Sequence, residues 1–233
     1  MSYKIILLGT HEYNWLLNPF MFLFRKYWGS GKIVYITDKV IDDIDCMQVP
    51  AYSEGVWNWH QWFSNGLVSI CEYYKDELLV VFLLDHWLNR PVNLNYVNQL
   101  AEYMHQHDNI IRGNLTVGTC LDNYGKIIDT YKDLDIVSVP SHHRHCSFGG
   151  GITFCPSIFN ANNLLKVLGN HWSFHDTEKL GTESMNNLKS IGTKQPILYR
   201  THAMYHQKRN TVSLVGLNDD IKEMIPDDWT IEE

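Results

Sequence analysis

The chain has 233 residues, of which 45% are hydrophobic and 19% charged, and this balance excludes a disordered chain and favours one globular domain. Its net charge of −7 argues against a large non-specific nucleic-acid surface, because proteins that hold DNA through its phosphates are usually basic. The five cysteines are scattered and form no CxxC pair, which indicates free thiols and a cytoplasmic protein. No run approaches the roughly 20 apolar residues of a membrane span, and the first apolar run is too short for a signal peptide.

The first 110 residues alternate between strand and helix patterns. Residues 4–9 and 32–38 are short apolar runs that end in a glycine or a polar residue, as buried strands do. The aromatic, amphipathic stretch 15–28 lies between them and stops at Gly29-Ser-Gly31, so it predicts a helix. Strand, helix and strand at this spacing predict two parallel neighbouring strands.

The next elements continue the alternation. A helix is expected from Ser53 to about Tyr74, the strongest strand from Glu77 to Asp85, and a helix from Asn93 or Asn95 to about His107. Beyond them we expect strands at 115–118, 136–139, 151–155, 196–200 and 212–215, and helices at 161–168 and 178–190. The sequence therefore predicts one α/β domain over residues 1–225, with a mostly parallel central sheet flanked by helices, and an acidic surface tail at 226–233.

Ligands of open α/β sheets gather outside the carboxyl ends of the strands. Asp85 ends the most apolar strand, where its carboxylate is able to hold a divalent cation or a ribose or sugar hydroxyl. The alternative is an aspartate that caps the following turn.

Polar residues also follow the first two expected strands. Asp38 follows the second strand, and the candidates after the first are Thr10, His11, Glu12 and Trp15. These positions are also at the sheet edge where a ligand is expected. The alternatives are core packing for Trp15 and a turn for Asp38.

Several segments resemble, in the same order, a family of bacterial and phage glycosyltransferase-like proteins of the GT-A type. Phe82 to Val92 (FLLDHWLNRPV) resembles the family's acidic strand end, and Pro19 to Trp28 resembles its first helix. Trp172-Ser-Phe and Glu178 to Thr182 resemble its later "W-x-F-E-x-x-G-T" region. The match covers roughly residues 1–220. It implies a single-domain GT-A-like (Rossmann-like) fold that moves a sugar from a nucleoside diphosphate sugar, with UDP favoured, to an acceptor hydroxyl.

The resemblance also implies a donor site, in which the base and ribose of the nucleotide lie near Thr10, His11, Glu12, Trp15 and Asp38. GT-A enzymes normally hold Mn²⁺ or Mg²⁺ with an Asp-x-Asp-like pair, and here Asp85 is the only carboxylate of the motif because Trp87 stands at the second position. Metal dependence is therefore open. Arg200, His202 and Lys208 are the basic candidates for contacting the diphosphate, and a solvated charged face is the alternative.

The resemblance places Glu178, with Asp176 beside it, at the family's acidic position, where a carboxylate takes the proton of the acceptor hydroxyl. The alternative for Glu178 is a first-turn helix carboxylate stabilised by the helix dipole. Trp172 is expected either to stack on a sugar or to fill the core.

Residue types that bind zinc gather in the segment Ser141-His-His-Arg-His-Cys146. Ligands this close in sequence, however, rarely reach one tetrahedral ion together. A loop that binds the acceptor or a phosphate is favoured over zinc, with a plain surface loop as the alternative. The acceptor-binding candidates there are His142, His143, Arg144 and His145.

The acceptor implied by the resemblance is a hydroxymethylated pyrimidine in phage DNA, which would place the enzyme in the host cytoplasm, or a cell-surface saccharide. A non-catalytic nucleotide-sugar binding module is the main rival. A nucleotidyltransferase ranks lower, because Thr10-His-Glu-Tyr13 lacks a Gly-rich basic loop. The sequence indicates neither the sugar nor the oligomeric state.

Overall fold

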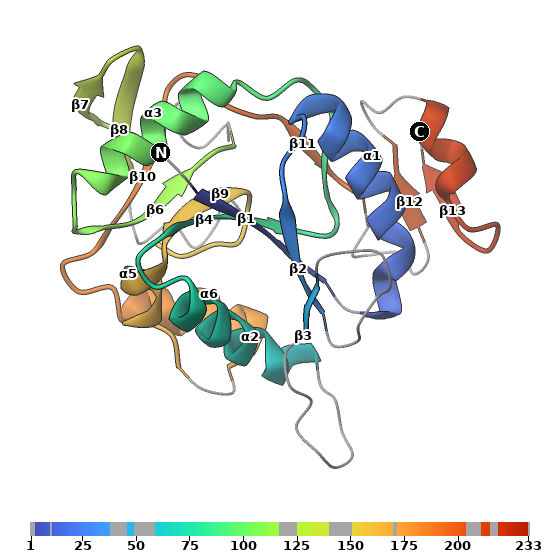
Figure 1. Cartoon of the computed structure of the whole chain (residues 1–233), viewed down its shortest axis with the longest axis horizontal. Coiled ribbons are helices and arrows are strands. Elements are labelled where there is room, and N and C mark those ends of the chain that lie inside the picture. Colours follow the sequence, from blue (N-terminus) through green and yellow to red (C-terminus); the bar gives the residue numbers. More distant parts are fainter. Residues whose placement is uncertain are drawn as a thin grey trace.

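The computed structural model describes residues 3–9, 11–37, 46–48, 59–116, 125–139, 151–169, 172–203, 211–214 and 219–232. Within them, nine strands form one sheet in the order β3-β2-β1-β4-β9-β6-β10-β8-β7 (Figure 1). The strands are β1 (Tyr3–Leu8), β2 (Ile33–Thr37), β3 (Cys46–Gln48), β4 (Leu78–Leu83), β6 (Ile110–Asn114), β7 (Ile127–Tyr131), β8 (Leu134–Val139), β9 (Ser157–Asn160) and β10 (Lys189–Thr193). β8 and β9 run opposite to the other strands, which all share one direction, so most strands of the sheet point the same way.

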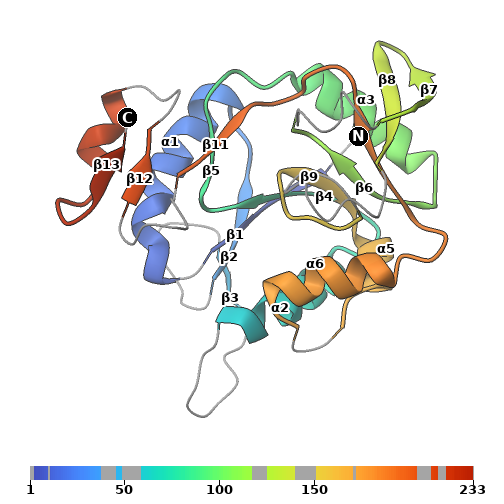
Figure 2. The same ribbon diagram turned by 180° about the vertical axis from the view of Figure 1, so that it is seen from behind.

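Helices cover both faces of this sheet. They are α1 (Leu17–Tyr27), α2 (Trp59–Tyr73), α3 (Leu94–His105), α5 (Ala161–Leu165) and α6 (Phe174–Glu183), with the 3₁₀ helices η1 (His11–Leu16) and η2 (Asp219–Met224). Figure 2 shows α2, α5 and α6 gathered on one side, with α1 and α3 away from them. Two small sheets pair β5 (His86–Leu88) with β11 (Arg200–His202), and β12 (Thr211–Ser213) with β13 (Thr230–Glu232).

The alternation of side chains along a strand builds two cores from one apolar run. Ile5 and Leu7 of β1 belong to the core that includes α1 and α3, whereas Ile6 and Leu8 belong to the core that includes α2 and α5. β4 divides in the same way, so both strands are apolar on both faces, as a central parallel strand must be. Phe82 of β4 meets aromatic rings of α1, with centroids 5.9 Å from Phe20.

The predicted α/β fold with a mostly parallel central sheet is confirmed. The expected helix 178–190 was wrong at both ends, because α6 begins after Ser173 in a capping box and Lys189–Thr193 forms β10. The expected strand 151–155 is an irregular connection, and β6 lies before the expected 115–118. These segments are short and contain Gly or polar residues, so their state depends on partners far along the chain.

The last described residues form a short strand at the surface of the protein. Thr230–Glu232 pairs in parallel with β12, and the Trp229 ring lies 4.4 Å from the Trp15 ring. Ile221 and Ile225 are buried in the same core as α1. This end of the chain therefore packs on the α1 side of the sheet.

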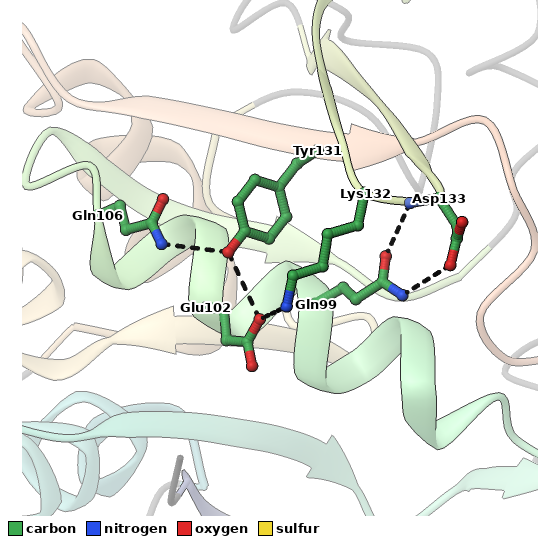
Figure 3. A network of polar contacts seen from close by, with 6 residues as sticks. All are labelled: Gln99, Glu102, Gln106, Tyr131, Lys132 and Asp133. Atoms are coloured by element: carbon green, nitrogen blue, oxygen red, sulfur yellow. Dashed lines mark hydrogen bonds and ion pairs between the residues drawn. The ribbon is translucent and has the colours of Figure 1, made fainter.

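The β7–β8 hairpin at the far edge of the sheet is fastened to α3 by polar side chains (Figure 3). Gln99 donates to the Asp133 carboxylate and accepts from the Asp133 amide, both at 3.1 Å. Lys132, at the turn with φ 53°, pairs with Glu102, which also accepts from the Tyr131 hydroxyl at 3.4 Å. This network gives the hairpin a structural attachment to α3.

None of the helices among the described residues could serve as a membrane-spanning segment.

Candidate functional site

The carboxyl ends of β1, β2 and β4 approach each other closely at Gly9. A Cβ on Gly9 would lie 2.7 Å from the Tyr35 hydroxyl oxygen and 2.8 Å from Leu84 Cδ2, so this position has no room for a side chain. The Tyr35 hydroxyl in turn donates to Asn14 Oδ1 at 3.1 Å, which holds η1 over the end of β2. The sheet edge predicted to bind the donor is thus tightly built.

Asp85 lies two residues beyond β4, where the chain turns into β5. β5 pairs antiparallel with β11, with His202 opposite His86 and Arg200 opposite Leu88. The Ala203 amide donates to the Asp85 carbonyl at 2.8 Å. This pairing brings the backbone of His202 and Ala203 next to Asp85, and it places Arg200 three residues further along β5.

The Asp85 carboxylate lies 3.9 Å from His86 Nε2, and 14% of its side chain is exposed. Trp87, at the second position of the motif, is fully buried in the core with α1 and α3. Among the described residues, no group of three or more His, Cys, Asp or Glu is placed to hold a metal. Mg²⁺ is usually bound by one or two carboxylates together with substrate phosphates and waters, so Asp85 fits as a single protein ligand of that kind.

A second group of polar residues surrounds the segment Gly151–Ser157. Arg112 of β6 is fully buried, and its guanidinium donates through Nε to Ser157 Oγ at 2.9 Å and through Nη1 to the Gly151 carbonyl at 3.3 Å. The Ser190 hydroxyl donates to the same carbonyl. Gly151 has φ +53°, and a Cβ there would lie 2.2 Å from Thr182 Cγ2. Three separate elements therefore fix the start of this segment.

Glu178 of α6 points into that segment. Its Oε1 accepts from the Phe154 amide at 3.0 Å. Burial raises the pKa of the Glu178 carboxyl, while the Phe154 amide, the Thr153 hydroxyl and the Arg112 charge act against that rise. A partly buried carboxyl with a raised pKa suits a general base.

Asp176 is placed differently. It is exposed, and its carboxylate accepts from the Ser173 hydroxyl at 2.7 Å in the capping box that begins α6. The helix-terminal role that was the alternative for Glu178 is therefore filled by Asp176, whose side chain takes part in the capping box.

Arg200 joins the two groups of residues. From β11, beside the segment that follows Asp85, its Nη2 reaches Cys155 Sγ at 3.2 Å. Cys155 is next to Phe154, whose amide holds Glu178. We call Asp85, Arg200, Phe154, Cys155 and Glu178 the carboxyl-edge site.

Two predicted aromatic residues lie outside this chain of contacts. The partly buried Trp15 packs on Trp229, as the core alternative expected. The Trp172 ring lies over Gly169, where a Cβ would come 2.1 Å from the ring, and its amide donates to Ser64 Oγ of α2 at 2.8 Å. Neither residue contacts the carboxyl-edge site in the contacts described, and their binding roles stay predictions.

The remaining candidates are only partly described. His11 and Glu12 lie in η1 and His202 lies in β11, but their side chains fall outside what the structure describes. The others lie outside the described residues altogether: Thr10, Asp38, His142, His143, Arg144, His145 and Lys208.

Sequence reasoning missed Arg112, Ser157 and Cys155. The residues next to Arg112 in the sequence do not show that it is buried. Its hydrogen-bond partners, Gly151 and Ser157, lie 39 and 45 residues away. The one available signal was an arginine and an asparagine inside an otherwise apolar strand, since a buried polar group requires partners.

Comparison with known proteins gives likeness of fold alone. No protein-family model matches the chain, and no curated protein matches its sequence. S. aureus TarS residues 1–349 superpose with a TM-score of 0.49 at 10% identity over 86% of this chain. A Bacillus anthracis protein described as a glucose-1-phosphate thymidylyltransferase gives 0.46 at 10% identity over 96% of this chain, and a UDP-glucose pyrophosphorylase gives 0.44 at 10% over 86%.

The chain spans 60% of that TarS fragment and 37% of a longer TarS structure. These neighbours resemble the chain in its α/β fold alone. At these TM-scores the likeness assigns no reaction to the chain, so its chemistry has to be argued from the carboxyl-edge site.

Proposed function

We propose that the protein is a glycosyltransferase that moves a sugar from a nucleoside diphosphate sugar, with UDP as the favoured nucleotide, to an acceptor hydroxyl. One observation carries the proposal. The pairing of β5 with β11 brings Arg200 beside the segment that follows Asp85, and Arg200 also contacts Cys155 next to the amide that holds Glu178. These contacts link, through intervening residues, an acid, a cation and a candidate base near the carboxyl edge of the sheet, where α/β folds bind ligands.

Asp85 and Arg200 are assigned to the donor. The Asp85 carboxylate would contact the ribose or sugar hydroxyls, or would be the protein ligand that holds a Mn²⁺ or Mg²⁺ ion. Such an ion neutralises charge on the diphosphate when it is bound. The Arg200 guanidinium supplies fixed positive charge to the same diphosphate, because guanidinium–phosphate hydrogen bonds are strong and directional.

Glu178 is assigned as the base of an inverting transfer. Its carboxylate takes the acceptor hydroxyl proton while that oxygen attacks the anomeric carbon. The new carbon–oxygen bond forms as the bond from the anomeric carbon to the diphosphate breaks, and the diphosphate leaves with the electron pair. The Phe154 amide, which donates to Oε1, fixes where this carboxylate lies.

The acceptor we propose is a hydroxymethylated pyrimidine in DNA, with a cell-surface saccharide as the competing class. Support for DNA comes from the sequence alone, because the basic residues His142 to His145 lie outside the described residues. The net charge of −7 limits the contact to a small area around one flipped base.

Donor binding is the first test. Titration calorimetry with UDP and UDP-sugars, with and without Mn²⁺, should show binding by the wild-type protein. Arg200→Gln should weaken it by roughly 10-fold or more, as expected for loss of a hydrogen bond to a charged group. Arg90→Gln is the matched control, because Arg90 is exposed and lies 4.8 Å from the Tyr199 ring centroid, outside the carboxyl-edge site. If no nucleotide binds the wild-type protein, the proposal is wrong.

A nucleotide-sugar binding module without catalysis is the second candidate. The buried Trp87 favours it, because the second motif position offers no carboxylate. Incubation with the bound UDP-sugar and either acceptor class separates the two. Release of UDP that stops in Glu178→Gln supports the transferase, whereas donor binding without turnover on any acceptor supports the module.

A further inference from the structure

We propose that Arg112 is the residue that positions Glu178 and keeps its carboxyl ionised. This inference deepens the proposed function, since it concerns the base of the same reaction. Arg112 does not touch the substrate in this scheme. It acts through the segment Gly151–Ser157 and through its own charge.

The first observation is how Arg112 is buried. No part of its side chain is exposed, and its Nη2 has no hydrogen-bond partner among the described residues. Its bonded partners, Ser157 Oγ and the Gly151 carbonyl, are both neutral. Burying a charge without a counter-charge is costly, and a neutral side chain would serve to tie the segment down. An arginine here is explained by an acidic group nearby rather than by the two hydrogen bonds alone.

The second observation is where those bonds lead. Arg112 holds both ends of Gly151–Ser157, and the amide of Phe154 in its middle donates to Glu178 Oε1 at 3.0 Å. The position of the carboxylate therefore depends on the guanidinium through one fixed segment. Thr182, one turn after Glu178 on α6, accepts from the Ile152 amide at 2.9 Å and closes the same connection from the helix side.

The charged and titratable groups around Glu178 can be named from each element packed against it. β6 contributes Arg112, the connecting segment contributes the Cys155 thiol near Arg112, and α6 itself contributes His175. His175 is exposed, so water screens its charge, whereas the Arg112 charge is buried and little screened. Arg112 is therefore the main positive charge that favours the ionised carboxyl.

The experiment measures the carboxyl directly, with no need of a substrate. The side-chain carboxyl carbon of Glu178 is followed by ¹³C NMR as a function of pH in uniformly labelled protein, with Glu178→Gln used to identify the signal. Arg112→Gln, which keeps polar atoms but loses the charge, should raise the titration midpoint by roughly one pH unit or more. Arg112→Lys should leave the midpoint near that of the wild type.

Two further variants keep the test decisive. Ser190→Ala removes the other side-chain donor to the Gly151 carbonyl without changing any charge, so it should leave the midpoint unchanged. Because loss of a buried charge can prevent folding, Ser157→Ala is measured as well. It frees Nε of Arg112 and should raise the midpoint by less than Arg112→Gln does. The inference would be overturned by an unchanged midpoint in Arg112→Gln or, if that variant does not fold, in Ser157→Ala.

Failure of the inference and failure of the proposed function give different results. The NMR titration reports on Glu178 and Arg112 whether or not any nucleotide binds. A raised midpoint in a protein that binds no nucleotide refutes the proposed function and leaves the coupling of the two residues standing. Donor binding together with an unchanged Glu178 midpoint refutes the coupling of Arg112 and Glu178 and leaves the proposed function standing.

Discussion

The Trp87→Asp substitution would give the chain an Asp-x-Asp pair at residues 85 and 87. We expect it to unfold the protein rather than create a metal site. Trp87 is fully buried in the core with α1 and α3, and removing a buried Trp side chain costs roughly 3–5 kcal/mol. An unpaired carboxylate in that place adds several kcal/mol more. Together these costs are about the size of the whole stability of an ordinary domain, roughly 5–15 kcal/mol.

Urea denaturation followed by far-UV circular dichroism measures the effect, and calorimetry with Mn²⁺ measures any gain of metal binding. Trp87→Phe is the control, because it keeps an aromatic ring and removes an indole N–H that has no partner among the described residues. It should stay within about 1.5 kcal/mol of the wild type. The reasoning is refuted if Trp87→Asp unfolds at the wild-type urea concentration and binds Mn²⁺ more tightly than the wild type does.

Three further changes test the architecture around the site. Gly9→Ala forces a Cβ against buried side chains and should lower the free energy of unfolding by about 1–3 kcal/mol in urea denaturation; no change would mean that the sheet edge yields easily. Ser173→Ala removes the capping box of α6 and should cost about 1 kcal/mol by the same measurement, whereas Ser173→Asn, which still caps, should cost little. Glu178→Gln should change how stability depends on pH: the raised pKa means that the folded protein binds the proton more tightly, so wild-type stability falls as pH rises from the unfolded value through the folded one. The variant lacks this fall, and identical slopes for both proteins between about pH 4 and pH 7 would contradict the assigned direction.

The sequence predicted well those parts of the fold that are apolar on a local scale. β1, β2 and β4 are continuous apolar runs, and each was expected within one or two residues of its observed bounds. α3 begins at one of the two expected N-caps, Asn93, whose side chain accepts from the Tyr96 amide at 3.1 Å. These signals need no distant partner, since burial and capping are read from neighbouring residues.

Elements that depend on distant pairing were predicted poorly. β10 contains Ser190 and Gly192, has little β-propensity of its own, and is held as a strand because β6 and β8 flank it. β5 was not expected at all, because its three residues form a strand only against β11, more than 100 residues later. The α6 start was misplaced because Glu178 looked like a first-turn residue, whereas the capping box belongs to Ser173.

In the candidate site, too, some residues have a local sequence signal, whereas their relation to each other depends on distant contacts. This difference affects how the residues should be tested. Asp85 was found because it ends an apolar strand, and Arg200 because it lies in a basic cluster. Their relation to Glu178 depends on Cys155 and Phe154, which have no distinctive sequence signal and contact partners 45 and 24 residues away. A single substitution at Arg200 therefore removes a predicted phosphate contact and also a contact to the segment that holds the predicted base. For this reason a loss of turnover in Arg200→Gln does not by itself assign Arg200 to the donor. The assignment requires that donor affinity falls while the Glu178 titration midpoint stays at its wild-type value.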